Sequence, residues 1–267
     1  MENILKKIIE RKKERISEYK KKIQVNEILN SIKNIKNFDN FINKINSRTL
    51  EKKISIIAEI KKSSPSAGLL VKNFDPLKIA NLYIENGASF LSVLTEEDFF
   101  HGKLDFIRNI KENYQIPILC KDFFIDPYQV PLAKYYGADC ILIILSAVDK
   151  IIAKDLYQTA LDLNMSVLVE VHSEREAELA LSFENSIIGI NNRNLKTLEI
   201  SLNTTFALSK ILSSHKNALV CESGIHAASD ITVVLDKAKI YNFLIGESLL
   251  TSNDIGAKLK EFSQINP

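Results

Sequence analysis

Eight short apolar runs recur along this chain of 267 residues and constrain its fold more than any other feature. They are rich in β-forming residues. Most are continuous rather than alternating, which is expected of strands that are covered on both faces of a parallel sheet. The runs lie at residues 54–60, 90–94, 116–120, 140–145, 166–171, 186–190, 218–221 and 241–245.

Stretches with helical spacing separate these runs. Apolar residues three and four positions apart predict helices over residues 76–86, 103–113, 150–163 and 173–183. Asp126-Pro127 predicts a further helix start, and Ser173 followed by Glu176 fits a capping box. Gly87 and Gly137 each stand just before a predicted strand, the usual place for a glycine that ends a helix.

Alternating strands and helices predict an α/β fold, and we expect a (β/α)8 barrel, also called a TIM barrel. Eight strand–helix units in residues 51–267 match the size of such a barrel. The alternative is an open, doubly wound sheet, which usually has fewer strands, and the sequence has no GxGxxG or Walker-type loop to support it. We expect residues 1–50 to form a helical extension that packs on the barrel.

The beginning of the chain is basic and amphipathic. Residues 1–22 contain nine Lys or Arg and an apolar stripe that consists of Ile4, Leu5, Ile8, Ile9 and Ile16. A helix of this kind could meet a membrane surface or an acidic partner. Because the net charge of the chain is only +2, we favour a helix whose stripe packs on the barrel and whose basic face is solvated.

Composition narrows the setting. The chain is 46% hydrophobic and 25% charged, as a soluble globular protein is, and its small net charge gives no argument for nucleic acid as a partner. No apolar run is long enough for a membrane span, and the N-terminus lacks the features of a secretory signal. Cys120, Cys140 and Cys221 lie far apart, which predicts reduced, buried thiols in a cytoplasmic protein.

Ionisable residues stand where the predicted strands end, and in a (β/α)8 barrel these ends surround the active site. Glu59 and Lys61 share one side of the first strand, whereas Lys121, Glu170 and Glu222 end or follow the third, fifth and seventh strands. Two lysines and up to three glutamates around one dry cavity would shift one another's pKa values, which general acid–base catalysis requires. The alternative, a set of structural ion pairs, accounts poorly for all five together.

Glycines after the last two predicted strands indicate a phosphate site. Barrels often bind phosphate with the loops at these two places and with a short extra helix. Ser223-Gly224 and Gly246 lie in those loops, and residues 246–250 could form the short helix, before a further helix that begins near Ser252. Glycine lets backbone N–H groups approach an anion. No spacing of His, Cys, Asp or Glu resembles a metal site, and we expect neither a metal nor a cofactor.

Loops at the expected barrel mouth combine apolar and polar side chains. Residues 63–66 follow the first strand, Phe100 follows the second, and Phe123 and Leu142 complete an apolar part of the mouth. This mixture predicts a substrate with an aromatic or otherwise apolar end opposite its phosphate. His172, just after the fifth strand, is a further candidate acid or base.

Taken together and in order, these segments resemble the indole-3-glycerol phosphate synthases of tryptophan biosynthesis. The similarity covers essentially the whole chain, the N-terminal extension included. The stretches that carry it are Ile57-Ala58-Glu59-Ile60-Lys61-Lys62-Ser63-Ser64-Pro65-Ser66, Leu94-Thr95-Glu96 with Phe99-Phe100-His101-Gly102, Lys121-Asp122-Phe123, Gly189-Ile190-Asn191-Asn192-Arg193-Asn194-Leu195, Cys221-Glu222-Ser223-Gly224-Ile225 and Leu244-Ile245-Gly246-Glu247.

The resemblance implies a carbon–carbon lyase that closes the pyrrole ring of a phosphorylated small molecule, 1-(2-carboxyphenylamino)-1-deoxyribulose 5-phosphate, and releases carbon dioxide and water. Lys61 and Lys121 match the general-acid lysines, Glu170 matches the general base, and Glu59 belongs to the same network. Which lysine serves condensation and which dehydration stays open. The residues that match ligand-binding groups are Asn191, Arg193, Glu222 and Ser223 for positioning, Ser64, Pro65, Phe100, Phe123 and Leu142 for the anthranilate ring, and Gly224, Gly246 and the backbone of Glu247 for the phosphate.

Two positions depart from the pattern of the resemblance. Residue 101 is His where Gln is more familiar, and residue 247 is Glu where some relatives carry Ser, so only the backbone of Glu247 is expected to meet phosphate. The chain leaves no room for a fused isomerase, which implies a monofunctional enzyme. Two other functions stay open, a Schiff-base aldolase that uses Lys61 or Lys121 and a non-catalytic barrel. The sequence says nothing of protein partners or oligomeric state.

Overall fold

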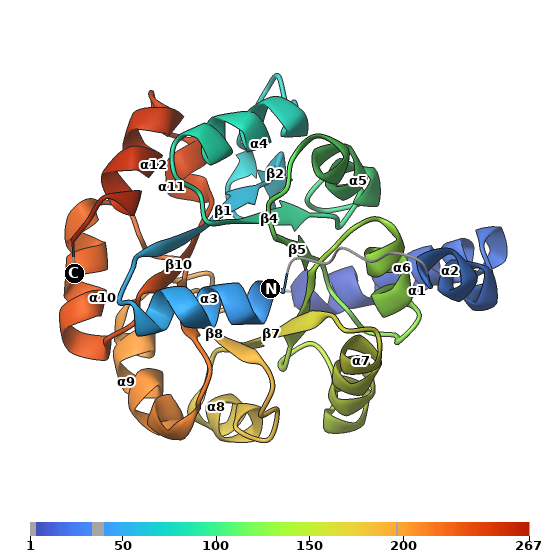
Figure 1. Ribbon diagram of the computed structural model, residues 1–267. Helices are drawn as coiled ribbons and strands as arrows, with labels where there is room; N and C mark the ends of the chain where they lie inside the picture. Colours follow the sequence, from blue (N-terminus) through green and yellow to red (C-terminus); the bar gives the residue numbers. More distant parts are fainter. Residues whose placement is uncertain (1–3, 34–39, 196, 267) are drawn as a thin grey trace.

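The computed structural model describes residues 4–33, 40–195 and 197–266. Within them, eight parallel strands close into a barrel in the order β1-β10-β9-β8-β7-β6-β5-β4, with β4 paired back to β1 (Figure 1). The strands are β1 (Ser55–Ile60), β4 (Phe90–Leu94), β5 (Ile118–Lys121), β6 (Cys140–Ile144), β7 (Ser166–Val171), β8 (Ile187–Asn191), β9 (Leu219–Glu222) and β10 (Asn242–Ile245). The predicted (β/α)8 barrel is confirmed.

Helices connect successive strands and surround the barrel (Figure 1). They are α4 (Pro76–Glu85), α5 (Leu104–Asn113), α6 (Gln129–Tyr135), α7 (Lys150–Asp162), α8 (Glu174–Ala180), α9 (Asn203–Ile211) with the 3-10 turn η1 (Leu212–Ser214), and α10 (Ala228–Ala238). After the last strand come α11 (Glu247–Leu250) and α12 (Ile255–Ser263), as the predicted short helix and its successor. A short hairpin of β2 (Ser63–Ser64) and β3 (Gly68–Leu69) lies in the loop after β1.

Most predicted helix boundaries hold to within one residue, but the helix predicted to end at residue 183 ends at Ala180, and the last helix begins at Ile255 rather than near Ser252. Gly87 and Gly137 have φ angles of 101° and 100°, in the left-handed region that favours glycine at a helix end. The prediction of a helix start at Asp126-Pro127 is wrong, because α6 begins at Gln129. The Asp126 carboxylate accepts the N–H of Tyr128 at 2.9 Å, so these residues form a turn before the helix.

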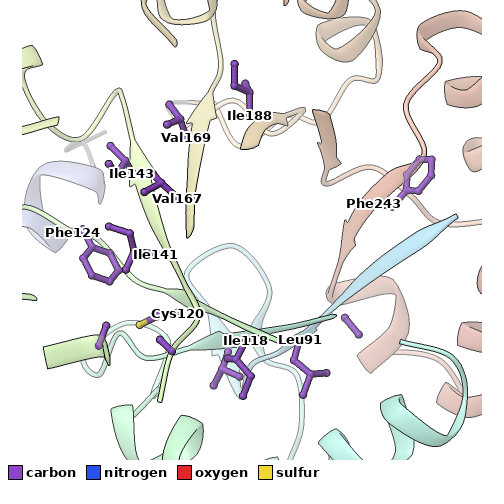
Figure 2. Packing of buried hydrophobic residues seen from close by; sticks show 14 of the residues in the cluster. Leu91, Ile118, Cys120, Phe124, Ile141, Ile143, Val167, Val169, Ile188 and Phe243 are labelled. Atoms are coloured by element: carbon purple, nitrogen blue, oxygen red, sulfur yellow. The ribbon is translucent and has the colours of Figure 1, made fainter. Parts of the chain in front are cut away.

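Alternation along each strand separates two apolar cores. Side chains that point outward pack against the helices, and Figure 2 shows several of them, among them Ile141 and Ile143 of β6. Side chains that point inward, such as Phe90 and Leu168, fill the barrel. The three cysteines are divided between these layers and are buried and free, as predicted. At the carboxyl end of each strand the inward positions face the barrel mouth.

The N-terminal helices reach both ends of the barrel. They are α1 (Ile4–Lys22), α2 (Val25–Ile32) and α3 (Phe41–Leu50), and residues 1–3 of the predicted basic helix lie outside the described residues. Figure 1 shows α3 across the barrel opening. Phe41 and Ile45 of α3 are fully buried in the inner core, and the N–H of Ile42 donates to Ser166 Oγ, at the start of β7, at 3.0 Å. Helix α3 therefore closes the end at which the strands begin.

Helix α1 packs by its apolar stripe, but its basic face is not fully solvated. Ile8 and Ile16 are buried, as expected. Lys12 is only 4% exposed and lies 2.8 Å from Asp122 Oδ1 and 3.4 Å from Glu97 Oε2. A buried ammonium is tolerated where carboxylates pair with it, and these carboxylates come from loops that the spacing within α1 does not reveal. None of the helices in the described ranges is long and apolar enough to cross a membrane.

Candidate active site

A cavity of about 190 Å³ lies where the strands end. Apart from His172, it is lined by all the residues that the sequence predicted for catalysis, substrate and phosphate. These are Glu59, Lys61, Ser64, Pro65, Phe100, Lys121, Phe123, Leu142, Glu170, Asn191, Arg193, Glu222, Ser223, Gly224, Gly246 and Glu247. The strand-end positions that were picked from the sequence therefore share one space.

Lys121 stands between two buried carboxylates. Its Nζ lies 2.7 Å from Glu170 Oε2 and 3.3 Å from Glu222 Oε2. Both glutamate side chains are 2% exposed. Together with Glu59, these residues come from the alternate strands β1, β5, β7 and β9, and alternate strands supply one layer of a barrel interior. Lys121, Glu170, Glu222 and Glu59 are hereafter called the ionisable layer.

The charges of this layer hold one another in different protonation states. Burial alone would lower the pKa of Lys121, but the surrounding glutamates raise it well above its usual value. Burial would raise the pKa of Glu170, but Lys121 and His172 bring it well below its usual value. Burial raises the pKa of Glu222 to about 8, because Lys121 offsets it only in part and Glu170 repels a second charge. Near neutral pH the trio is an ammonium, a carboxylate and a protonated carboxyl group.

Lys61 and Glu59 form a second pair beside this trio. Lys61 Nζ lies 2.8 Å from Glu59 Oε1, which confirms that the two side chains share one side of β1. Gly246, at the end of β10, leaves space for the Glu59 carboxylate, because a Cβ on residue 246 would lie 2.5 Å from Glu59 Oε1. The cavity thus holds two lysine–glutamate pairs.

Asn191 connects the ionisable layer to the loop after β9. Its Nδ2 donates to Glu170 Oε1 at 3.2 Å, and its Oδ1 accepts from Ser223 Oγ at 2.9 Å and from the N–H of Arg193 at 3.0 Å. Ser223 has a φ of 64°, in the left-handed region that a residue other than glycine rarely adopts. A strained residue held by a side-chain hydrogen bond at a cavity wall is typical of a functional site.

Asn192 also holds the loop after β9. The sequence alone gave this residue no role of its own. Its Nδ2 donates to the carbonyl groups of Glu222 and Ser223 at 3.0 and 3.1 Å. Its Oδ1 accepts from the N–H and the hydroxyl of Thr205 in α9. The sequence signal is a pair of adjacent asparagines at the end of β8, because alternation points one side chain into the barrel and the other away from it.

The apolar part of the cavity is formed by two aromatic rings and by the N-terminal helix. The ring centroids of Phe100 and Phe123 lie 6.2 Å apart. The carboxylate of Glu96 accepts the N–H groups of Phe99 and Phe100 at 2.7 and 3.0 Å, which fixes the loop that carries the first ring. The lining residues that the sequence did not single out for the site are mainly apolar and include Ile4, Leu5 and Ile8 of α1 and Leu195, Leu198 and Ile200 after β8. The spacing of the apolar residues in α1 predicts that they form a stripe, but it does not predict which end of the barrel the stripe covers.

Gly224, Gly246 and the first turn of α11 also line the cavity. Gly224 has a φ of 85°, a conformation for which glycine is the suitable residue. The carboxylate of Glu247 accepts a hydrogen bond from Arg193 Nη2 at 3.1 Å, so this side chain already has a partner. In the described part of the chain, no group of three or more His, Cys, Asp or Glu side chains is placed to hold a metal ion.

Solved structures with a similar fold have distant sequences. A 3-hexulose-6-phosphate synthase from Salmonella typhimurium superposes with a TM-score of 0.63 at 13% identity, covering 79% of this chain and 97% of that one. The tryptophan synthase subunit alpha from Legionella pneumophila gives a TM-score of 0.60 at 12% identity, covering 83% and 96%. Identities this low support the barrel fold alone.

Sequence comparison is more specific. A family model described as indole-3-glycerol phosphate synthase matches residues 5–262. The indole-3-glycerol phosphate synthase of Bordetella pertussis is 40% identical over 259 residues, covering 97% of this chain and 98% of that protein. That of Polaromonas sp. strain JS666 is 40% identical over 261 residues, with 98% of each covered. The chain therefore belongs to the indole-3-glycerol phosphate synthase family, the carboxy-lyases of tryptophan biosynthesis.

Proposed function

We propose that this cavity closes the pyrrole ring of 1-(2-carboxyphenylamino)-1-deoxyribulose 5-phosphate by general acid–base catalysis with Lys61, Lys121 and Glu170, and that Glu59 holds Lys61. The observation that carries the proposal is the buried pair of Lys121 and Glu170, an ammonium and a carboxylate 2.7 Å apart at the barrel mouth. Acid and base are thus present together, each in the protonation state that it needs at neutral pH.

The reaction needs protons at defined places. Attack of the anthranilate ring carbon on the ketone places negative charge on the ketone oxygen, which an ammonium group protonates. The bond to the carboxylate then breaks, and its electron pair restores the ring conjugation as carbon dioxide leaves. Departure of water needs a second proton at the hydroxyl, while Glu170 removes the proton that completes the pyrrole ring. Lys61 and Lys121 supply the two protons.

The rest of the lining positions the two ends of the substrate. The residues proposed to bind it are Ser64, Pro65, Phe100, Phe123 and Leu142 around the anthranilate ring, Asn191, Arg193, Glu222 and Ser223 along its length, and Gly224, Gly246 and the backbone of Glu247 at the phosphate. The first N–H groups of a helix lack an acceptor within the helix, which supports α11 as part of the phosphate site. The contact of Glu247 with Arg193 supports a role for its backbone rather than its carboxylate.

A Schiff-base aldolase is supported less well. A lysine that attacks a carbonyl group must first lose its proton, which requires a lowered pKa. Burial does act in that direction on Lys121, but the neighbouring glutamates outweigh it and raise the pKa. The direction of this shift supports Lys121 as a proton donor rather than an amine nucleophile.

Incubation with the carboxyphenylamino-deoxyribulose phosphate tests the function, with indole fluorescence as the readout. We expect turnover by the unmodified chain, a loss of about 100-fold or more in Glu170→Gln with the fold intact, and no adduct after borohydride treatment. Absence of indole fluorescence from the folded chain, or a borohydride-trapped adduct, would contradict the proposal.

We also propose a cytoplasmic location and the division of the chain into an extension, residues 1–50, and a catalytic barrel, residues 51–267. The free thiols of Cys120, Cys140 and Cys221 support a reducing compartment. Helix α3 ends at Leu50 and β1 begins at Ser55, which supports the boundary.

A further inference from the structure

His172 connects the ionisable layer to helix α8. It follows the last residue of β7, and alternation places it on the same side of the chain as Glu170. Its Nε2 lies 3.1 Å from Glu170 Oε1, and its Nδ1 lies 3.4 Å from Glu176 Oε2. The side chain is 11% exposed, and the described lining of the cavity does not include it. We therefore expect His172 to act through Glu170 rather than on the substrate.

Glu176 is held in place by the start of α8. Its N–H donates to Ser173 Oγ at 3.4 Å, as the predicted capping box requires. Its carboxylate, however, accepts the N–H of His172 at 2.8 Å, where a capping box would use the N–H of Ser173. This places the carboxylate directly behind the imidazole, so the chain Glu170–His172–Glu176 runs from the cavity wall to a helix N-terminus.

The two oxygens of Glu170 have different partners. Oε2 lies 2.7 Å from Lys121 Nζ. Oε1 lies 3.1 Å from His172 Nε2 and accepts a hydrogen bond of 3.2 Å from Asn191. The terminal torsion of a glutamate side chain is broad, so a carboxylate with a partner on one oxygen only would be free to turn. Lys121 holds one oxygen, while the hydrogen bond of Asn191 and the ion-pair contact of His172 hold the other, and together they fix the carboxylate plane.

We propose that His172 is a positioning residue for the general base: with Glu176 behind it, it fixes the orientation of the Glu170 carboxylate and sets a second positive charge beside it. The inference rests on the proposed role of Glu170. Burial alone would lower the pKa of His172, but Glu170 and Glu176 raise it to about 9, so the imidazole is charged at neutral pH. Of the other ionisable groups, Glu176 on α8 faces His172, whereas Lys121 on β5 and Glu222 on β9 face Glu170.

Steady-state kinetics across pH test the proposal with His172→Gln and His172→Phe. Glutamine keeps an N–H donor without the charge, whereas phenylalanine keeps neither. We expect kcat to fall about 10-fold in the first variant and about 100-fold in the second, because a misplaced base loses its alignment. KM should stay within about twofold, since His172 does not line the cavity.

The acid limb of kcat/KM plotted against pH separates the two possible roles of His172, because a purely structural role would leave this limb in place. Glu170 must be ionised to act as a base, and a cation beside it lowers its pKa. Loss of the His172 charge raises that pKa, so the acid limb should move to higher pH by about one unit in both variants. If His172→Phe fails to fold, His172→Gln carries the test.

Glu176→Gln tests the outer half of the unit, with Glu174→Gln as the matched control. Removal of the Glu176 charge lowers the pKa of His172, so the imidazole loses its proton at a lower pH and the alkaline limb should move to lower pH. Glu174 is exposed on the same helical turn, and its change should leave both limbs in place.

Two results would overturn the inference. The first is a pH profile of kcat/KM in the His172 variants whose acid and alkaline limbs coincide with those of the unmodified enzyme, while Glu170→Gln is inactive. This result would exclude the role of His172 and leave the proposed function standing. Full activity of Glu170→Gln would remove the general base and the inference with it. A higher kcat in His172→Gln than in His172→Phe, together with an acid limb of kcat/KM that moves to higher pH in both variants, supports the inference.

Discussion

Gly189 on β8 faces the carboxylate of Glu222 on β9 so closely that residue 189 has no room for a side chain. A Cβ there would lie 2.0 Å from Glu222 Oε1 and 2.7 Å from Leu168 Cδ2. Gly246 on the far side of β9 bears the same relation to Glu59. β8 and β10 each stand between two strands that supply the ionisable layer, so a glycine on β8 and another just after β10 each give a neighbouring carboxylate its space.

Gly189→Ala should therefore lower both stability and turnover. The added methyl group displaces Glu222 from Lys121 or spreads β8 from β9, at a cost of about 1–3 kcal/mol in the free energy of unfolding. Urea unfolding and kcat measure the two effects. In a Glu222→Ala background the same change should cost clearly less, because its nearest contact is gone. An equal loss in the free energy of unfolding in both backgrounds would mean that Leu168 alone excludes a side chain at residue 189.

Lys121→Met should abolish most of the activity. Removing the ammonium takes away a proton donor and the partner of Glu170, and we expect a loss of about 100- to 10,000-fold in kcat with a folded chain. Indole fluorescence and circular dichroism check these outcomes. Lys62→Met is the matched control, because Lys62 is a neighbour of Lys61 that does not appear in the described cavity lining. Comparable activity in the two variants would contradict the role of Lys121.

Glu222→Gln should change how stability depends on pH. The pKa of Glu222 is raised by burial to about 8, above its value in the unfolded chain. Its stabilising contribution is therefore complete at pH values below the unfolded pKa and is lost as pH rises through the folded pKa. Glutamine does not titrate, so the melting temperature of the unmodified protein should fall relative to that of Glu222→Gln between pH 5 and about pH 8.5. A constant difference across this window would show that the carboxyl group is not held protonated.

Lys12→Met should weaken the attachment of α1 to the barrel mouth. Asp122 and Glu97 would lose the ammonium that pairs with them, at a cost of about 3 kcal/mol in the free energy of unfolding. Because Asp122 stands between Lys121 and Phe123 in the chain, kcat/KM should fall as well. Lys13→Met, at the next and exposed position of α1, should change neither quantity, and thermal unfolding with steady-state kinetics separates the two variants.

The barrel and the positions of the ionisable layer could be predicted because both depend on local pattern. Continuous apolar runs mark buried strands, and period-two alternation puts Glu59 and Lys61 on one side without knowledge of any neighbour. Strand ends meet at one opening in every (β/α)8 barrel, so residues distant in sequence could be assigned to one cavity before any distance was known. Helix starts were less certain, as Asp126 shows, because its side chain forms a turn instead of a cap.

Other features depend on contacts that no local pattern contains. The burial of Lys12 depends on carboxylates from two loops far along the chain, and the stripe of α1 does not specify which end of the barrel it covers. The contact between Glu176 and His172 could not be predicted, because a capping box predicts that the Glu176 carboxylate accepts the N–H of Ser173 and not that of His172. The sequence does not show why residue 189 must be glycine, because the reason is the Glu222 carboxylate on the neighbouring strand β9.

The pairing of β1 with β10 also bears on how the enzyme is made. During synthesis the first strand emerges long before its partner, and the cavity draws on residues from Ile4 to Ser248. A nascent chain that ends before β10 leaves one side of β1 and one side of β9 without hydrogen-bonding partners, and unpaired strand edges promote aggregation. Active enzyme can therefore arise only once β10 and the cavity residues up to Ser248 have left the ribosome, and until then the growing chain depends on protection of those two edges.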